Sequence, residues 1–237
     1  MMLPFHIKGY QRKKMTKALP SSPWCKLPRG RRLVLKSDDQ YVDAFNKHAK
    51  PGSRINTSLV PEPFFGNLSA PVVLLLLNPG LGGDDARWHA KPLYRTRLAN
   101  AVRRGKSSEH FHLLAEPEAP GTRWWRRACK ELIDEVGLQT LATRLLAVEY
   151  FPYHSRTFAH SHVRLPSQRH AFAIVERAVQ RGAEIVCMRG ERLWKGAVPA
   201  LEGYVKYRKL KSTRSSSLSR KNLPKFKQLV GVLQSKR

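Results

Sequence analysis

Apolar residues gather in short runs along this chain. Three runs are nearly free of polar residues, and a fourth alternates apolar and basic residues: Val72–Leu77, Leu145–Val148, Glu184–Met188 and Tyr204–Leu210. Short apolar runs bounded by proline, glycine and polar turns are typical of strands buried on both faces of a parallel sheet. The pattern therefore predicts four strands.

Apolar residues at helical spacing lie between these runs. They predict helices over residues 39–48, 122–136, 167–182, 191–201 and 221–234. Strands that alternate with helices indicate an α/β fold with three layers, α/β/α, around a central four-stranded, mostly parallel sheet. Ligands of such sheets bind beyond the carboxyl ends of the strands. Asn78, Glu149, Gly190 and the 212–220 loop are all expected at that edge.

The net charge of the chain indicates what kind of partner this fold binds. The 237 residues include 44 Lys and Arg against 17 Asp and Glu, a formal net charge of +27. Residues 1–37 and 203–237 contain no acidic residue. We expect a basic N-terminal arm over 1–37, as a tail or a strap, and one domain over 38–237 that ends in a basic segment. Such a charge points to a nucleic acid as partner, with a merely solvated surface as the alternative.

Other classes of protein are disfavoured by the composition. No apolar stretch is long enough to span a membrane, and the ends show no long amphipathic stripe. Three widely spaced cysteines support neither a disulfide framework nor an iron–sulfur site, and the histidines show no zinc-site spacing. We expect a cytoplasmic, DNA-associated monomer without metal or cofactor.

Two motifs carry candidate chemistry. The first strand breaks on the turn Asn78-Pro79-Gly80-Leu81-Gly82-Gly83, and a serine-rich basic turn, Ser215–Arg220, lies about 140 residues later. Together, in this order, they resemble motifs 1 and 2 of the uracil-DNA glycosylase superfamily, closest to its mismatch-specific branch. The resemblance spans about residues 58–235, but only these two motifs are specific.

The resemblance assigns the chemistry of motif 1. The side-chain carbonyl of Asn78 would hold the attacking water, and Gly80 and Leu81 would lie against the base. Because an amide is a weak base, the reaction would pass through an oxocarbenium-like sugar. Backbone N–H groups of the Gly80–Gly83 turn could stabilise the departing base. Either Asp84 or the adjacent Asp85 would position the water, or would simply begin the next helix.

Motif 2 would contact DNA. Leu218 would enter the space left by an extruded nucleotide, while neighbouring residues grip the phosphates: Arg214, Ser216, Ser217, Ser219 and Arg220. The motif departs from the family at positions 214 and 215, where Arg and Ser replace Asn or His and then Pro. No histidine in this loop can bind the base, and Arg214 is its electrostatic substitute. The alternative is a flexible linker.

Three further residues are expected to bind the base. Glu149 ends the second strand, where its carboxylate would accept from the exocyclic amine of cytosine and repel the O4 of uracil; its alternative is an ion pair with an arginine. Trp88 and Tyr153, with Tyr94, are candidate stacking platforms or core residues.

The prediction is a metal-independent DNA glycosylase that flips a uracil, a mismatched thymine or a modified cytosine of foreign DNA and hydrolyses its N-glycosidic bond. The alternative is a non-catalytic DNA- or RNA-binding protein with the same fold. Alkali-dependent strand cleavage, lost in Asn78→Ala, would separate the two.

Overall fold

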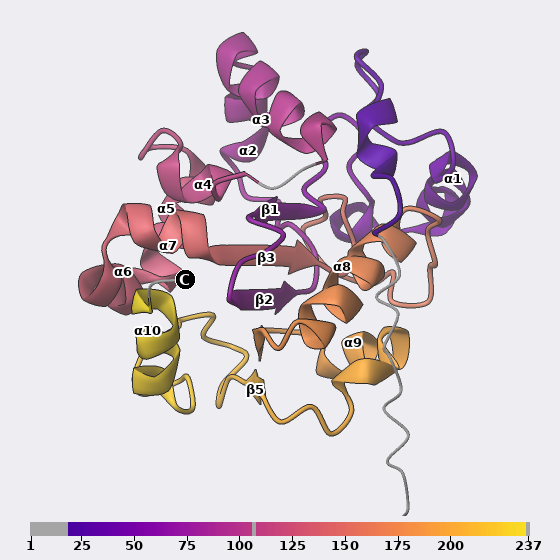
Figure 1. Cartoon of the computed structure of the whole chain (residues 1–237). Coiled ribbons are helices and arrows are strands. Elements are labelled where there is room, and N and C mark those ends of the chain that lie inside the picture. Colours follow the sequence, from indigo (N-terminus) through magenta and orange to yellow (C-terminus); the bar gives the residue numbers. More distant parts are fainter. Residues whose placement is uncertain (1–18, 106–107, 236–237) are drawn as a thin grey trace, which may run out of the picture.

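A five-stranded mixed sheet forms the centre of the molecule (Figure 1). The structure, a computed structural model, describes residues 19–105 and 108–235. The strand order is β1-β3-β2-β4-β5, where β1 is Phe64–Gly66, β2 Val72–Leu76, β3 Leu145–Glu149, β4 Glu184–Cys187 and β5 Tyr207–Lys209. Strands β3, β2, β4 and β5 are parallel, and β1 pairs with β3 in the antiparallel sense.

The α/β class is confirmed, but the prediction of four strands was wrong by one. The missed strand, β1, has three residues in an aromatic and glycine segment, too short for a periodic pattern to show. It pairs at the free edge of β3, with Phe65 opposite Ala147. The fourth predicted strand is shorter than expected, because only Tyr207–Lys209 pairs with β4.

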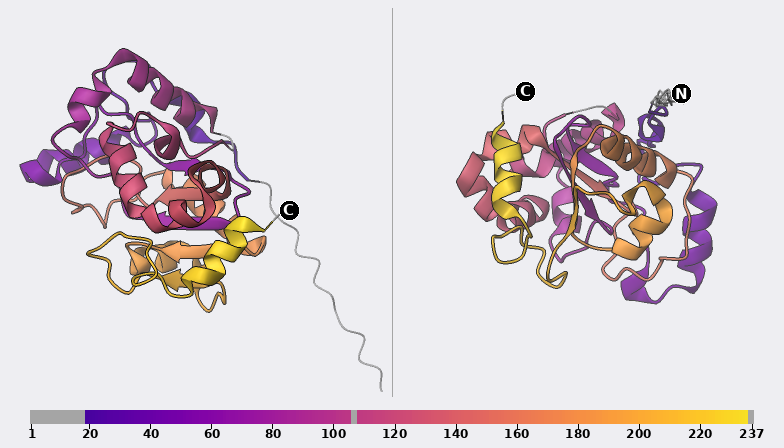
Figure 2. Two further views of the ribbon diagram at one scale, coloured as in Figure 1. Left: turned by 90° about the vertical axis from the view of Figure 1, so that its left-hand side faces the viewer. Right: turned by 60° about the horizontal axis from the view of Figure 1, so that its bottom comes forward.

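Side chains of the strands alternate between the two faces of the sheet, so that a separate hydrophobic core lies on each face. On one face, Val73 and Leu75 of β2 pack with α1, α3, α8 and α9. On the other, Val72 and Leu74 pack with α5, α6, α7 and α10. The right-hand view of Figure 2 shows the sheet between α10 and the α8–α9 pair. The continuous apolar run of β2 follows from burial on both faces.

Four of the predicted helical segments are helical largely as expected, and 122–136 is divided at Cys129. Helices α3, α4 and α7 were not predicted, and a helix at the position of α2 was expected only in the alternative reading of Asp84 and Asp85. The bounds of the α-helices are α1 Asp39–His48, α2 Asp85–His89, α3 Pro92–Arg104, α4 Phe111–Leu114, α5 Pro120–Ala128, α6 Lys130–Val136, α7 Leu138–Arg144, α8 Gln168–Gln180, α9 Glu191–Ala197 and α10 Phe226–Gln234. Short 3-10 helices cover Pro23–Lys26, Pro51–Ser53 and Pro199–Leu201. Within the described ranges, no helix combines the length and apolar character that crossing a membrane requires.

Residues 19–37 form a strap over the domain rather than a free arm. Trp24 and Leu33 are each 1% exposed and belong to the core. The guanidinium of Arg103 in α3 donates to the carbonyl groups of Leu27 and Pro28. This part of the predicted basic arm therefore contributes to folding, and residues 1–18 lie outside the described residues.

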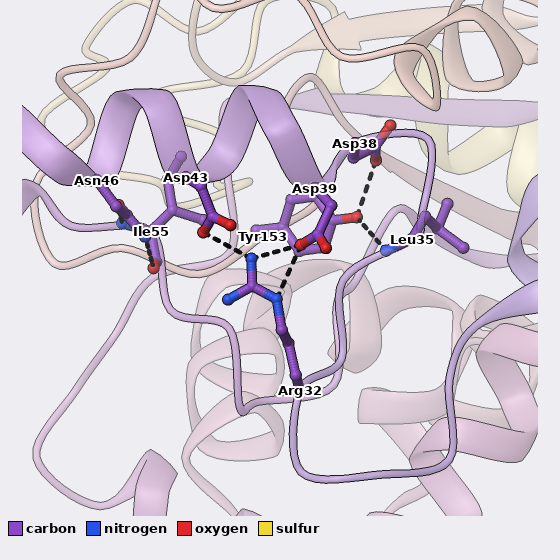
Figure 3. A network of polar contacts seen from close by, with 8 residues as sticks. All are labelled: Arg32, Leu35, Asp38, Asp39, Asp43, Asn46, Ile55 and Tyr153. Carbon is purple, nitrogen blue, oxygen red and sulfur yellow. Dashed lines mark hydrogen bonds and ion pairs between the residues drawn. The ribbon is translucent and has the colours of Figure 1, made fainter.

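A polar network fixes the strap to α1 and to the segment after β3 (Figure 3). The hydroxyl of Tyr153 donates to Asp38 at 2.8 Å and accepts from the backbone N–H of Leu35 at 3.1 Å. Nearby, Arg32 bridges Asp39 and Asp43 of α1. Tyr153 is fully buried, so its predicted role as a base-stacking platform is corrected to a structural one.

Candidate active site

A cavity of about 460 Å³ lies at the carboxyl ends of the parallel strands. Its wall includes the turn after β2, the end of β3 and the segment after β4. Residues of α2, α4 and α5 complete it. The volume is in the range of ordinary ligand pockets, and the position is the one expected from the strand pattern.

Asn78 lines this cavity with its amide in a fixed orientation. Its Nδ2 donates to the carbonyl oxygen of Pro79 at 2.9 Å and to Oγ of Ser155 at 3.0 Å. Both partners occupy the nitrogen end of the amide. Among the described residues none donates to Oδ1 of Asn78, so this oxygen is the end of the amide available to a ligand.

Side chains bind part of the backbone in the turn after Asn78, so that not all of its polar groups are available to a ligand. Gly80 and Leu81 line the cavity, as predicted. The N–H of Gly82 donates to the Asp85 carboxylate at 2.5 Å, and the carbonyl oxygen of Gly80 contacts Nδ1 of His154 at 2.7 Å. The Gly82 donor is therefore not available to a departing base.

Of the two adjacent acids after the Asn78 turn, Asp85 lines the cavity and Asp84 does not. Asp84 forms ion pairs with Arg87 and Arg123, each at 3.2 Å, and does not line the cavity. Asp85 does line it, and burial followed by the charge of Glu62 raises the pKa of Asp85. The sequence shows two adjacent acids but does not show which of them points into the cavity. That direction depends on where helix α2 begins, which is at Asp85.

The cavity also holds a carboxylate that the sequence analysis missed. Glu62 stands between Pro61 and Pro63, whose rings restrict the backbone to extended conformations. Its N–H donates to the carbonyl oxygen of Pro152 at 2.8 Å, and the Pro63 carbonyl accepts from the N–H of Glu149 at 3.0 Å. These bonds place Glu62 beside the end of β3, with its side chain 12% exposed.

Three buried histidines surround Glu62. Nε2 of His112 is 3.1 Å from one carboxylate oxygen, and Nε2 of His154 is 3.7 Å from the other. The ring of His89 packs against that of His154 with centroids 5.5 Å apart. Burial would raise the pKa of Glu62, but the charges of His112 and His154 outweigh it and lower the pKa to about 2. Glu62 is thus an ionised carboxylate in a nearly closed setting.

Glu62, His89 and His154 are the described residues that come nearest to a metal-ligand set, with one ligand atom of each within 4.8 Å of the others. The hydrogen bonds of the two rings indicate which ring nitrogens carry a proton. The N–H of Val60 donates to Nδ1 of His89, which leaves Nε2 as the protonated nitrogen of the neutral ring. Both ring nitrogens of His154 contact carbonyl oxygens, of Gly80 and Val60, which can only accept. In this arrangement the rings offer N–H groups, which suit a carboxylate better than a cation.

Glu149 also faces the cavity, but its pKa is shifted in the opposite direction. It is 8% exposed, and among the described residues Oε2 has no hydrogen-bond partner. Burial, reinforced by the negative charge of Glu62, raises the pKa of Glu149 well above its ordinary value, against a smaller effect of Arg189. The sequence-based prediction that Glu149 reads the base stays a prediction, and a carboxyl that keeps its proton can both donate and accept.

Of the three aromatic residues predicted at the site, Tyr94 lines the cavity and Trp88 and Tyr153 do not. Trp88 is 7% exposed, packs edge-on against Tyr94 and has Nζ of Lys91 3.4 Å above its ring. It does not line the cavity, so its predicted stacking role is corrected to a core role. Tyr94, Trp124 and Phe158 do line the cavity. Trp124 also packs, partly buried, against the core that contains its buried neighbour Trp125.

Four exposed arginines form the rim of the cavity: Arg123, Arg127, Arg156 and Arg189. Trp124 lies between two of them in α5. Arg189 donates to Oγ of Ser216 at 3.1 Å. The guanidinium groups at the rim can bind the charged part of an anionic ligand. A neutral part of the same ligand would then enter the acidic interior.

The serine-rich turn packs onto the domain. Leu218 is completely buried in the core with α5, α6 and α10, and its N–H donates to the carbonyl oxygen of Ala128 at 2.8 Å. Arg220 is ion-paired with Glu131 and Glu135. The predicted wedge role of Leu218 and phosphate role of Arg220 therefore do not fit this conformation.

The other residues of the turn divide into two groups. The hydroxyl and carbonyl of Ser219 accept from the backbone N–H of Asn222, so this serine closes a turn. Ser216 lines the cavity beside Arg189, while Ser217 is half-buried and Arg214 is exposed. Arg214 and Ser216 remain placed where a nucleic acid could reach them.

No family model matches the chain, and neither the curated proteins nor the solved structures compared with it yield a match.

Proposed function

We propose that this protein is a DNA glycosylase, which hydrolyses the N-glycosidic bond of a pyrimidine nucleotide turned into the cavity. The observation that carries the proposal is the fixed amide of Asn78, whose Oδ1 is the free end in the turn after β2. An amide oxygen that accepts from a water can hold it for attack on the sugar. The motif resemblance of Asn78–Gly83 supports the same role.

The surroundings of the cavity support a nucleic acid as substrate. Enzymes that act on a base extrude it from the stack and bind it against aromatic groups, for which Trp124, Tyr94 and Phe158 are present. The rim arginines suit the flanking phosphates. The net charge of +27 favours the same partner. The excised base is a uracil, a mismatched thymine or a modified cytosine.

A second candidate is a nucleic-acid-binding protein without catalytic activity. The buried state of Leu218 favours it, because no wedge from this turn stands ready to replace an extruded base. Extrusion costs least for single-stranded or mismatched nucleotides. A catalytic protein with this turn is therefore expected to prefer such substrates.

The test is a panel of oligonucleotides that carry uracil, mismatched thymine or substituted cytosines in single and double strands. Base release is detected as strand cleavage after alkali. We expect release from at least one substrate, lost in Asn78→Ala while the dissociation constant for the oligonucleotide stays within about twofold. Binding without release from every substrate would establish the second candidate.

A further inference from the structure

Two carboxyl groups of the cavity are held in contrasting surroundings. Glu62 is faced by His89 and Asp85 of α2, by His112 of α4 and by His154 after β3. Glu149 is faced by Glu62 and by Arg189, which follows β4. Nε2 of His112 and Nε2 of His154 lie 3.1 Å and 3.7 Å from the oxygens of the first carboxyl, whereas one oxygen of the second has no hydrogen-bond partner among the described residues.

Resting on the proposed function, we propose that Glu149 is the acid that protonates the departing base, while the ionised Glu62 stabilises the positively charged sugar. Environments that separate two neighbouring acids in this way mark acid and anion roles in other hydrolases of glycosidic bonds. Burial and the neighbouring charge explain why the two groups differ, since the pKa of Glu149 is raised and that of Glu62 lowered.

Each step of the reaction balances. The bond between C1′ and the base nitrogen breaks, and its electron pair leaves with the base. The O–H proton of Glu149 moves to an edge atom of the base, so the base departs neutral. Water held by Asn78 adds to C1′ and loses one proton, which restores Glu149 through solvent. The products are the free base and an abasic sugar.

Other groups at the cavity are less suited to supply the proton. The amide of Asn78 is not an acid at accessible pH, and the ring nitrogens of His154 are engaged by carbonyl oxygens. Burial, with the charge of His154, lowers the pKa of His89 to about 3, so that its ring is neutral. Asp85 has a raised pKa, but its carboxylate is bound to the N–H of Gly82. Glu149 combines a raised pKa with a place in the cavity wall and a carboxyl oxygen that has no hydrogen-bond partner among the described residues.

Glu62 has two conceivable roles, as a general base or as a fixed anion, and its low pKa distinguishes between them. A group with a pKa of about 2 takes a proton from water poorly. A fixed negative charge on a side chain that is only 12% exposed stabilises an oxocarbenium-like sugar, because solvent screens it less than it screens a surface charge. Glu62 therefore acts as an anion and not as a general base.

The kinetic test measures single-turnover excision from the best substrate of the panel between pH 5 and pH 9. We expect the wild-type rate to fall as the pH rises through the pKa of Glu149. Glu149→Gln should lower the rate by about 100-fold or more, the usual scale of general acid catalysis, and should remove this pH dependence. The charge-matched control is Glu118→Gln, at an exposed residue away from the cavity.

A leaving-group comparison separates an acid from a structural residue. Bases that leave readily as anions, such as 5-fluorouracil, need no proton. Glu149→Gln should therefore slow their release much less than it slows release of the unsubstituted base. An equal loss for both bases would overturn the acid role.

A titration independent of activity tests the pair itself. Carboxyl carbons of 13C-labelled glutamate are followed by NMR, with Glu62→Gln and Glu149→Gln for assignment. We expect Glu62 to stay ionised down to about pH 2 and Glu149 to titrate well above its ordinary 4.5, with a lower pKa in Glu62→Gln. A Glu149 that titrates near 4.5 overturns the inference. If no substrate releases a base but this titration holds, the proposed function fails while the paired ionisation states stand.

Discussion

Asn78 and Ser155 are 77 positions apart, yet Nδ2 of Asn78 donates to Oγ of Ser155 at 3.0 Å. The bond joins the turn after β2 to the segment after β3, and it fixes which end of the amide faces the cavity. Ser155 is 1% exposed, so solvent does not compete for its hydroxyl. Ser155 is therefore a positioning residue for the proposed reaction.

Ser155→Ala is expected to slow excision without weakening DNA binding. A hydrogen bond of this kind contributes about 1 kcal/mol, which corresponds to roughly fivefold to tenfold in rate. Single-turnover rates and dissociation constants measured on one oligonucleotide check this. A variant whose binding falls as much as its rate would show that Ser155 supports the nucleic-acid surface instead.

Leu218→Ala should act as a core substitution. Truncation of a fully buried leucine costs about 2–5 kcal/mol of unfolding free energy, measured by urea unfolding. Leu93→Ala is the control, because Leu93 is 70% exposed and should change stability by less than about 0.5 kcal/mol. A stable Leu218→Ala protein that loses activity selectively on duplex DNA would instead support the wedge role predicted from the sequence.

Gly121→Ala should disturb the cavity although alanine favours helices. A Cβ at Gly121, in the first turn of α5, would stand 2.6 Å from two atoms of the His112 ring. The ring has to shift from its place beside Glu62, so we expect a changed pKa for Glu62 in the carboxyl titration and a lower unfolding free energy. Gly196→Ala in α9 is the control, because its Cβ meets nothing within 4 Å; there alanine should stabilise by up to about 1 kcal/mol. Equal behaviour of both variants would contradict the steric argument.

The rim arginines should determine part of the salt dependence of DNA binding. Replacing Arg127 and Arg156 with alanine should make the log–log slope of duplex affinity against salt shallower by about 0.9 for each phosphate that is no longer neutralised. Lys47→Ala with Lys50→Ala removes the same charge at exposed positions away from the cavity. The arginine pair is not at the interface if both double variants give one slope.

Stability should fall as the pH drops below about 6.5. Burial, with the charge of His112, lowers the pKa of His110 from 6.5 to about 3. A folded-state pKa below the unfolded one gives a contribution that is present above pH 6.5 and lost as the pH falls toward about 3. Both ring nitrogens of His110 lack hydrogen-bond partners among the described residues. His110→Phe should therefore reduce the loss of unfolding free energy between pH 7 and pH 5, and an unchanged loss would show that His110 does not cause it.

Local patterns in the sequence determined the framework of this protein. The apolar run of β2 and the Asn78-Pro79-Gly80 break after it predicted a buried strand and a turn at the sheet edge, because burial on both faces excludes polar residues from such a strand. The same reasoning correctly placed Glu149 at that edge. It could not find β1, whose pairing depends on β3 rather than on its own three residues.

Tertiary structure alone decided the directions and neighbours of the side chains. Glu62, His89, His112 and His154 come from four separate segments and share no spacing that a motif could show. Leu218 and Tyr153 are residue types that can serve as a wedge and as a stacking platform. Both side chains are instead buried in the core. Even the charge of Glu149 depends on burial and on Glu62, two features that exist only after folding, because desolvation and Coulomb interactions act through space and not along the chain.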